Sequence, residues 1–149
     1  MEKYRIPYSC QSIDDDDIQS VVNVLKADFI TQGPKVDEFE KKISEYLQSE
    51  YCISVNSATS ALHLACLALE LGENDILWTS PNSFVSSATC GLMCGANVDF
   101  VDIDPETYNM SIEALKIKLE NAKINNALPK VVVPVHFAGQ SCDMKAVSN

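Results

Sequence analysis

Two amphipathic helices are predicted near the start of the chain by the spacing of its apolar residues. After four aspartates, Asp14 to Asp17, apolar residues recur every three or four positions, at Ile18, Val21, Val22 and Leu25. Carboxylates suit the partial positive charge of a helix start, so the acidic run is interpreted as a cap and not as a metal site. A second helix is expected to begin at Pro34. Its buried stripe would consist of Val36, Phe39, Ile43 and Leu47.

From residue 51 onward the pattern alternates between strands and helices. Short apolar runs predict strands, at 51–55, 75–80, 97–103 and 130–135. Longer periodic runs predict helices, at 59–71 ended by Gly72, at 83–94 ended by Gly95, and after a cap at Ser111. Pro134 should end the last of these strands, because proline fits poorly in a central strand.

The strands are near-continuous apolar runs, which is typical of parallel strands covered by helices on both faces. The expected fold class is therefore α/β, a mostly parallel sheet with helices on both faces. We expect an N-terminal helical segment at 1–50 and an incomplete α/β domain at 51–149. A further helix begins in "QSCDMKAVSN" and the sequence stops in its first turns, so the chain is interpreted as a truncated piece of a larger domain.

Composition narrows the classes of protein that the chain can represent. Its 149 residues are 46% hydrophobic, enough for a real core, and its net charge of −10 argues against nucleic acid or an anionic membrane as a partner. No export signal or membrane span is visible, so the chain is expected in the cytoplasm, with its six cysteines reduced and buried. Cys90 and Cys94 have no accompanying ligand pair and no metal site is expected.

The stretch "VNSATSALHLA", residues 55–65, places a turn of small polar residues before an apolar helix. In open α/β sheets, ligands bind beyond the carboxyl ends of the strands, and a helix start there offers free N–H groups to a phosphate. The turn is therefore a candidate phosphate site to which Thr59 could add a hydroxyl. An ordinary turn with Ser57 or Thr59 as the N-cap is the alternative. A dinucleotide fingerprint is disfavoured, because the turn contains no glycine.

Two further aromatic positions are expected at the same edge of the sheet. Phe84 follows the strand at 75–80, where it could be a core residue or could lie flat on a cofactor ring. His136 follows the strand at 130–135 and, like His63, is interpreted as a structural histidine.

Five strings carry a resemblance to a known family: "FITQGPKVDEFE", "VNSATSALHLA", "SPNSFVSSA", "VDFVDIDPETYNM" and "VVVPVHFAGQSCDM". In this order and spacing the chain resembles the N-terminal part of the DegT/DnrJ/StrS sugar aminotransferases, which are pyridoxal 5'-phosphate (PLP) enzymes of fold type I. The resemblance implies that the chain is the start of the large PLP-binding domain, that the C-terminal small domain is absent, and that the full-length protein is a homodimer.

The resemblance also implies roles for individual residues. The amides of Ala58 and Thr59 and the Thr59 hydroxyl would receive the PLP phosphate, and Phe84 would stack on the pyridine ring. Tyr8, Thr31 and Gly33 would line the side where the nucleotide sugar binds. The implied reaction moves an amino group, from a donor such as glutamate, to a UDP-linked 4-keto sugar in surface glycan biosynthesis.

Two requirements of this chemistry lack a convincing candidate in the sequence. A Schiff-base lysine is needed, but Lys130 would lie at the wrong end of its strand and Lys145 on an exposed helical turn. A carboxylate is needed on the pyridine nitrogen, but Asp102 and Asp104 are interpreted as turn residues. In the family both groups lie downstream of the motif ending at Asp143. The chain alone is therefore expected to be inactive. A fragment or split-protein half that binds PLP weakly, and a PLP-dependent sugar dehydratase, remain alternatives.

Overall fold

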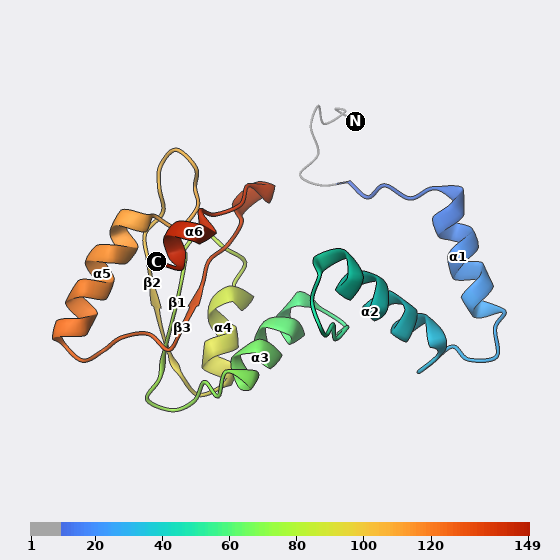
Figure 1. Cartoon of the computed structure of the whole chain (residues 1–149), viewed down its shortest axis with the longest axis horizontal. Helices are drawn as coiled ribbons and strands as arrows, with labels where there is room; N and C mark the ends of the chain where they lie inside the picture. Colours follow the sequence, from blue (N-terminus) through green and yellow to red (C-terminus); the bar gives the residue numbers. More distant parts are fainter. Residues whose placement is uncertain (1–9) are drawn as a thin grey trace, which may run out of the picture. The chain divides into compact units, whose positions relative to one another are not determined.

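The computed structural model describes residues 10–149, which fall into two compact units divided between Ser54 and Val55 (Figure 1). The first unit holds two helices, α1 (Asp15–Leu25) and α2 (Pro34–Leu47). The Asp14 side chain accepts hydrogen bonds from the Asp16 and Asp17 N–H groups, and the Asp17 side chain accepts one from the Asp14 N–H. The expected capping role of the acidic run is confirmed. The expected domain boundary after residue 50 stays a prediction.

The apolar stripe of α2 is not buried, contrary to the prediction. Val36, Phe39 and Leu47 are exposed, and Ile43 is half-buried. The helical period is present, but a stripe is buried only when another element covers it. Between residues 10 and 54 every side chain keeps some exposure, so the described part of this unit has no core of its own.

The expected strand at 51–55 is also wrong. These residues pair with no strand in the part of the chain that the structure describes, and Ile53 is 79% exposed. The N–H of Ser54 donates to the Glu40 carboxylate at 2.7 Å instead, and the Ser54 hydroxyl donates to the same oxygen at 2.8 Å. These two hydrogen bonds lower the pKa of Glu40.

The second unit is built on a three-stranded parallel sheet of order β2-β1-β3. The strands are β1 (Ile76–Thr79), β2 (Asn97–Phe100) and β3 (Val131–Val133). Thr79 of the central strand is opposite Phe100 on one side and Val133 on the other. Three of the four expected strands are thus confirmed, and β3 ends just before Pro134, as predicted.

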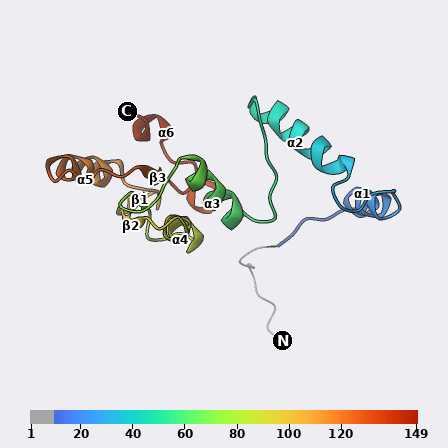
Figure 2. The same cartoon turned by 90° about the horizontal axis from the view of Figure 1, so that it is seen from below.

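Helices cover both faces of this sheet, which confirms the expected α/β class (Figures 1 and 2). α3 (Ala58–Ala68) and α4 (Ser86–Met93) pack together on one face, and α5 (Ile112–Ile124) lies on the other. A short 3-10 turn, η1 (Phe137–Gly139), and the helix α6 (Met144–Val147) follow β3. Ser111 caps α5 by accepting from the Ala114 N–H at 3.2 Å, as expected.

Each face has its own buried cluster, here called the α4 core and the α5 core. The α4 core consists of Cys66, Leu71, Leu77, Cys90, Ala96 and Val131. The α5 core consists of Trp78, Val101, Met110, Leu115 and Ala122. Leu77 and Trp78 are neighbours in β1 and point to opposite faces, as the period of two in a strand requires.

The two glycines expected to end helices behave differently. Gly95 has φ +80° and follows the end of α4, as predicted. Gly72 does not end α3. That helix stops earlier, at Ala68, and Glu70 takes the left-handed conformation with φ 55°. A polar residue at a helix end can adopt this conformation at a modest energetic cost, and the spacing of apolar residues does not predict it.

The cysteines are all free. Cys66, Cys90 and Cys142 are buried as expected, whereas Cys10 is exposed. Burial first, and then the neighbouring Cys90 and Cys94, raise the pKa of the Cys66 thiol to about 12. A thiol with so high a pKa is protonated at neutral pH and is a poor nucleophile or metal ligand. Within residues 10–149, no helix has both the length and the apolar character needed to cross a membrane.

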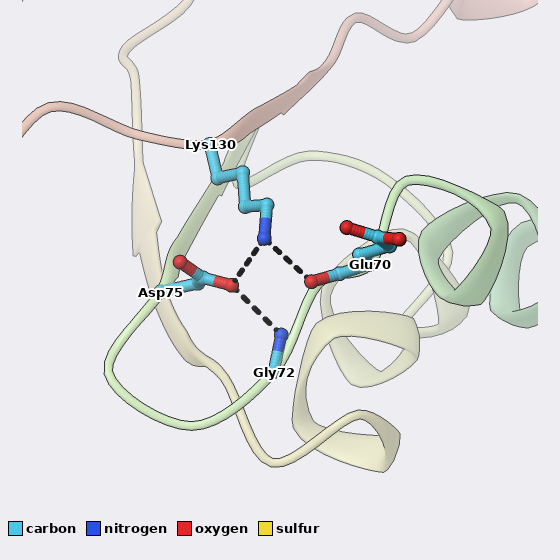
Figure 3. A network of polar contacts seen from close by, with 4 residues as sticks. All are labelled: Glu70, Gly72, Asp75 and Lys130. Carbon is cyan, nitrogen blue, oxygen red and sulfur yellow. Dashed lines mark hydrogen bonds and ion pairs between the residues drawn. The ribbon is translucent and has the colours of Figure 1, made fainter.

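Lys130 closes a polar network at the amino ends of β1 and β3 (Figure 3). Its ammonium donates to the Glu70 carbonyl and pairs with Oδ2 of Asp75 at 2.9 Å. The same carboxylate oxygen accepts from the Gly72 N–H at 2.9 Å. The lysine thus lies at the edge of the sheet opposite the carboxyl ends of the strands, as the sequence predicted. Hydrogen bonds from Lys130 and then from Gly72 lower the pKa of Asp75.

Lys130→Met is expected to raise the pKa of Asp75 back toward its ordinary value. Because this pKa is lowered in the folded chain, the ionised network stabilises the fold above about pH 4, and that contribution is lost as the pH falls through the lowered pKa. The variant should therefore be less stable at neutral pH and lose less on acidification than the parent. NMR titration of the Asp75 carboxyl carbon, with urea unfolding at several pH values, measures both effects.

Lys42→Met is the control for this titration. Lys35 and Lys42 lower the pKa of Glu38 on α2 to about 2, so the control should raise the pKa of Glu38 and leave that of Asp75 unchanged. An Asp75 titration unaltered by Lys130→Met would contradict the assigned cause.

Candidate functional site

The starts of α3 and α4 lie at the carboxyl edge of the sheet. α3 leads into the amino end of β1 through residues 69–75, so it runs back along the sheet and begins toward the opposite edge. α4 follows the carboxyl end of β1 and leads to the amino end of β2, so it also begins at that edge. This is the edge where open α/β sheets bind ligands.

The turn before α3 is shaped by hydrogen bonds among its small polar side chains. Ser57 is the N-cap, and its hydroxyl accepts from the Ser60 N–H at 3.2 Å. The Ser60 hydroxyl in turn donates to Oδ1 of Asn56 at 2.7 Å. Of the two caps left open by the sequence, Ser57 is therefore the one used. The Thr59 side chain takes no part in the cap.

Ala58 and Thr59 supply the first two N–H groups of α3. A helix leaves its first N–H groups without partners inside the helix, and the cap satisfies only that of Ser60. No partner for the Ala58 N–H, the Thr59 N–H or the Thr59 hydroxyl occurs among residues 10–149. These donors stand at the positive end of the helix dipole, which is the arrangement that binds a phosphate group.

Phe84 lies in the loop between β1 and α4. Its side chain is 74% exposed, so it is not a core residue, which was one of the two expectations for it. Asn82 precedes it and donates from Nδ2 to the Tyr108 carbonyl at 2.9 Å. Ser83 and Ser87 share a hydrogen bond of 2.6 Å at the start of α4. A free aromatic face at this edge can take a flat ring by stacking.

The acidic residues after β2 have the turn role that the sequence predicted. Oδ1 of Asp104 accepts from the N–H groups of Glu106 and Thr107 and from the Thr107 hydroxyl. These bonds, those of Thr107 first, lower the pKa of Asp104. Asp102 accepts from the N–H of its neighbour Ile103 at 2.8 Å. Both carboxylates therefore serve the local backbone.

His136 has the structural role expected of it. Its Nδ1 accepts a hydrogen bond from the Cys142 N–H at 3.0 Å, which closes the loop after β3. Acceptance at Nδ1 places the proton of a neutral imidazole on Nε2. Asn109 was not singled out in the sequence, although it stands in "YNM". It is 5% exposed and hydrogen-bonds the loop after β3 through its side chain.

In the described part of the chain, the structure shows no ligand-specific feature at the positions expected near a nucleotide sugar. Tyr8 lies outside the described residues. Thr31 is exposed in the loop before α2, and Gly33 is the N-cap of that helix. A Cβ at Gly33 would lie 2.9 Å from the Phe29 carbonyl oxygen, so this turn needs glycine for close backbone approach. Local packing thus accounts for Gly33, and its role toward a ligand stays a prediction.

A parallel sheet whose carboxyl edge carries an exposed aromatic ring and a helix start with N–H groups unpartnered among residues 10–149 defines an open α/β protein with a candidate ligand site at that edge. Comparison with known proteins gives the family. Residues 11–149 match the DegT/DnrJ/EryC1/StrS aminotransferase family, and the chain belongs to it.

Two relatives illustrate the similarity in sequence. The chain is 41% identical over 142 residues to the spore coat polysaccharide biosynthesis protein SpsC of Bacillus subtilis, covering 95% of the chain and 35% of SpsC. It is 39% identical over 144 residues to a Campylobacter jejuni UDP-4-amino-4,6-dideoxy-N-acetyl-beta-L-altrosamine transaminase, covering 97% of the chain and 37% of that enzyme. The chain thus spans about a third of the length of these relatives.

Solved structures agree with the fold. The PLP form of the putative sugar aminotransferase Spr1654 from Streptococcus pneumoniae superposes with a TM-score of 0.82 at 32% identity, covering 97% of this chain and 36% of that one. PseC of Helicobacter pylori, an aminotransferase of pseudoaminic acid biosynthesis, gives a TM-score of 0.79 at 30% identity, covering 95% and 37%. The chain therefore has the fold of the first third of a fold type I aminotransferase.

Proposed function

We propose that this chain supplies the phosphate cradle and the ring-stacking surface of a PLP-dependent sugar aminotransferase. The observation that supports this most is the start of α3, where the Ala58 and Thr59 N–H groups and the Thr59 hydroxyl have no partner in the described chain. Three donors without partners suit the phosphate of PLP. The 74% exposed ring of Phe84 at the same edge suits its pyridine ring.

Each group has a defined task in this proposal. The two N–H groups and the hydroxyl bind the phosphate dianion, which the positive end of the α3 dipole also favours. Phe84 holds the flat ring by stacking and keeps water from that face. When bound, PLP supplies an electron sink that stabilises negative charge at the reacting carbon.

The proposed reaction transfers an amino group, with glutamate as donor, to a UDP-linked 4-keto sugar. Support comes from the C. jejuni relative, named as a transaminase of an amino sugar joined to UDP, and from PseC, named for pseudoaminic acid biosynthesis. Tyr8, Thr31 and Gly33 are proposed for the sugar-nucleotide side, and a homodimer for the whole protein. A role in surface polysaccharide synthesis fits the name of SpsC.

The Schiff-base lysine is not proposed from this chain. Lys130 is held at the opposite edge of the sheet by Asp75 and Glu70, and Lys118 by Asp99 on the α5 face. We therefore expect the 149-residue chain to bind PLP without a covalent bond and to show no amino transfer by itself. Transfer to a UDP-linked 4-keto sugar by the pure chain would overturn this part of the proposal.

Ala58→Pro tests the phosphate cradle directly. Ala58 is the first residue of α3, where proline is tolerated, and Ser57 before it is extended, with φ −161° and ψ 156°. The substitution removes one N–H donor and should leave the helix intact. A hydrogen bond to a charged group contributes about 1.5–3 kcal/mol, so the Kd for PLP should rise about tenfold to a hundredfold. Equilibrium dialysis measures it, with circular dichroism as the check on folding.

Ile112→Pro is the matched control, because it makes the same change at the first residue of α5, behind an extended cap residue with ψ 121°. Its affinity for PLP should equal that of the parent. Pyridoxal without the phosphate should bind the parent chain weakly. The cradle would be refuted if Ala58→Pro bound PLP as the parent does, or if pyridoxal and PLP bound equally well.

A further inference from the structure

Asn109 makes three side-chain hydrogen bonds while only 5% exposed. Its Nδ2 donates to the carbonyls of Gln140 and Ser141, each at 3.2 Å, and its Oδ1 accepts from the Phe137 N–H at 2.9 Å. All three bonds reach the loop that follows β3. An ionised aspartate could not replace this side chain, because it has no donor for the two carbonyls.

Tyr108, the preceding residue, extends the link to the loop after β1. It has φ 59°, a left-handed conformation that costs a non-glycine residue energy and persists only where surrounding bonds hold it. Its N–H donates to the Asp104 carbonyl at 2.8 Å, and the Asp104 N–H donates to the Asn109 carbonyl at 2.8 Å. The Tyr108 carbonyl then accepts from Nδ2 of Asn82 at 2.9 Å.

An aromatic contact runs parallel to these hydrogen bonds. The rings of Tyr108 and Phe137 lie with their centroids 6.2 Å apart, within the range of a favourable aromatic pair. The loops after β1, β2 and β3 are therefore joined at the carboxyl edge of the sheet. Asn109 joins the loop after β2 to the loop after β3, and its neighbour Tyr108 holds the loop after β1.

The loop after β1 has few other side-chain anchors. The Ser80 hydroxyl and Oδ1 of Asn82 are buried without a partner among residues 10–149, and Ser80 is only 2% exposed. Asn82 has its side-chain bond to Tyr108, and Ser83 bonds within the loop and α4, to Ser87. Two residues beyond Asn82 comes Phe84. The Phe84 carbonyl accepts from the Ser87 N–H at 3.0 Å, which holds the α4 side of the loop, and the bond from Asn82 to the Tyr108 carbonyl holds the side that follows β1.

We propose that Asn109 is a positioning residue for the ring-stacking surface: by fixing Tyr108 against the loop after β3, it sets the loop that carries Phe84. The proposal rests on the proposed function as far as the ligand ring is concerned. It predicts that Asn109 affects binding of the pyridine ring and not binding of the phosphate, because among residues 10–149 no hydrogen bond joins the start of α3 to this network.

Asn109→Asp is the first test, since it keeps the shape and removes both donors. PLP should bind about three- to tenfold more weakly, as expected for one displaced contact, while inorganic phosphate should bind as in the parent. Hydrogen–deuterium exchange followed by mass spectrometry should show faster exchange in 80–86 as well as in 134–142. Asn125→Asp is the matched control, at an exposed asparagine whose Nδ2 donates to the Asn121 carbonyl. It should change neither the binding of PLP nor the exchange of these two segments.

Asn82→Ala is the second test, in case Asn109→Asp does not fold. It should weaken the binding of PLP as Asn109→Asp does. Hydrogen–deuterium exchange should become faster in residues 80–86 and stay unchanged in 134–142. Exchange altered only in 134–142 by Asn109→Asp, or equal loss of PLP and phosphate binding, would overturn the positioning role. So would unaltered PLP binding in Asn82→Ala. A parent chain that binds neither PLP nor phosphate would refute the proposed function alone, because the exchange experiment decides the positioning role without a ligand.

Discussion

Trp78→Ala is expected to lower the free energy of unfolding by about 3–5 kcal/mol, the usual cost of deleting a large aromatic side chain from a core. Trp78 is 2% exposed in the central strand and lies in the middle of the α5 core. Small domains are stable by only about 5–15 kcal/mol in total, so this loss removes a large share of the stability and should lower the urea midpoint clearly. Urea unfolding followed by circular dichroism measures the loss, because the change removes the single tryptophan of the chain.

Two further variants separate the packing of the Trp78 ring from its contact with a cation as causes of this loss of stability. The Lys118 ammonium lies 5.0 Å from the centre of the Trp78 ring and pairs with Asp99 at 2.6 Å. Lys118→Met should cost no more than about 1–2 kcal/mol, since it removes the cation and leaves the ring packed. Tyr46→Ala, at a ring that is 84% exposed, should change the stability by less than about 0.5 kcal/mol. A Trp78→Ala loss as small as that of Tyr46→Ala would show that the α5 core does not stabilise the fold.

Gly91→Val is expected to cost about 3 kcal/mol by overpacking on the other face of the sheet. Gly91 is buried in α4 against β1 and β2. A Cβ built there lies 3.1 Å from both Leu77 Cβ and Val98 Cγ2, before the two methyl groups of valine are added. The helix would have to move away from the strands, and the α4 core would open. Urea unfolding measures the loss, and increased exposure of the Cys90 thiol to a thiol reagent reports the opening.

Gly72→Val is the matched control, because a Cβ at Gly72 meets nothing within 4 Å. Its effect should stay within about 1 kcal/mol, and Cys90 should remain protected. Equal losses from the two glycine variants would mean that the close approach of α4 to the sheet is not what makes Gly91 necessary.

Local chemistry explains which elements could be predicted from the sequence. Asp14 and Ser111 cap helices through their own neighbours along the chain, and Pro134 ends β3 because it lacks an N–H. The order of helices and strands in residues 58–149 follows from apolar spacing, since each apolar run is covered by another within the same unit. The candidate phosphate turn could be found for the same reason: its small polar residues and the helix behind it are contiguous.

The wrong predictions concern features that depend on a partner. Residues 51–55 have the apolar character of a strand, but a strand forms only against another, and the Ser54 N–H is bonded to Glu40 instead. The α2 stripe is likewise apolar without a covering element in its unit. Asn109 escaped notice because a buried asparagine gives no signal in a sequence. Its importance comes from bonds to residues about 30 positions away, such as that to the Ser141 carbonyl.

The order of the strands in the sheet also bears on how the chain acquires its structure. Thr79 in the central strand pairs with Phe100, which follows it closely in the sequence. It also pairs with Val133, which lies 54 residues later and whose carbonyl accepts a hydrogen bond from the Thr79 hydroxyl. Contacts close in sequence form faster than distant ones. On a ribosome, β1 and β2 with α4 between them could assemble first. The other edge of β1 would then remain open until β3 emerged, and during that interval the nascent chain would be most exposed to aggregation and most dependent on chaperones.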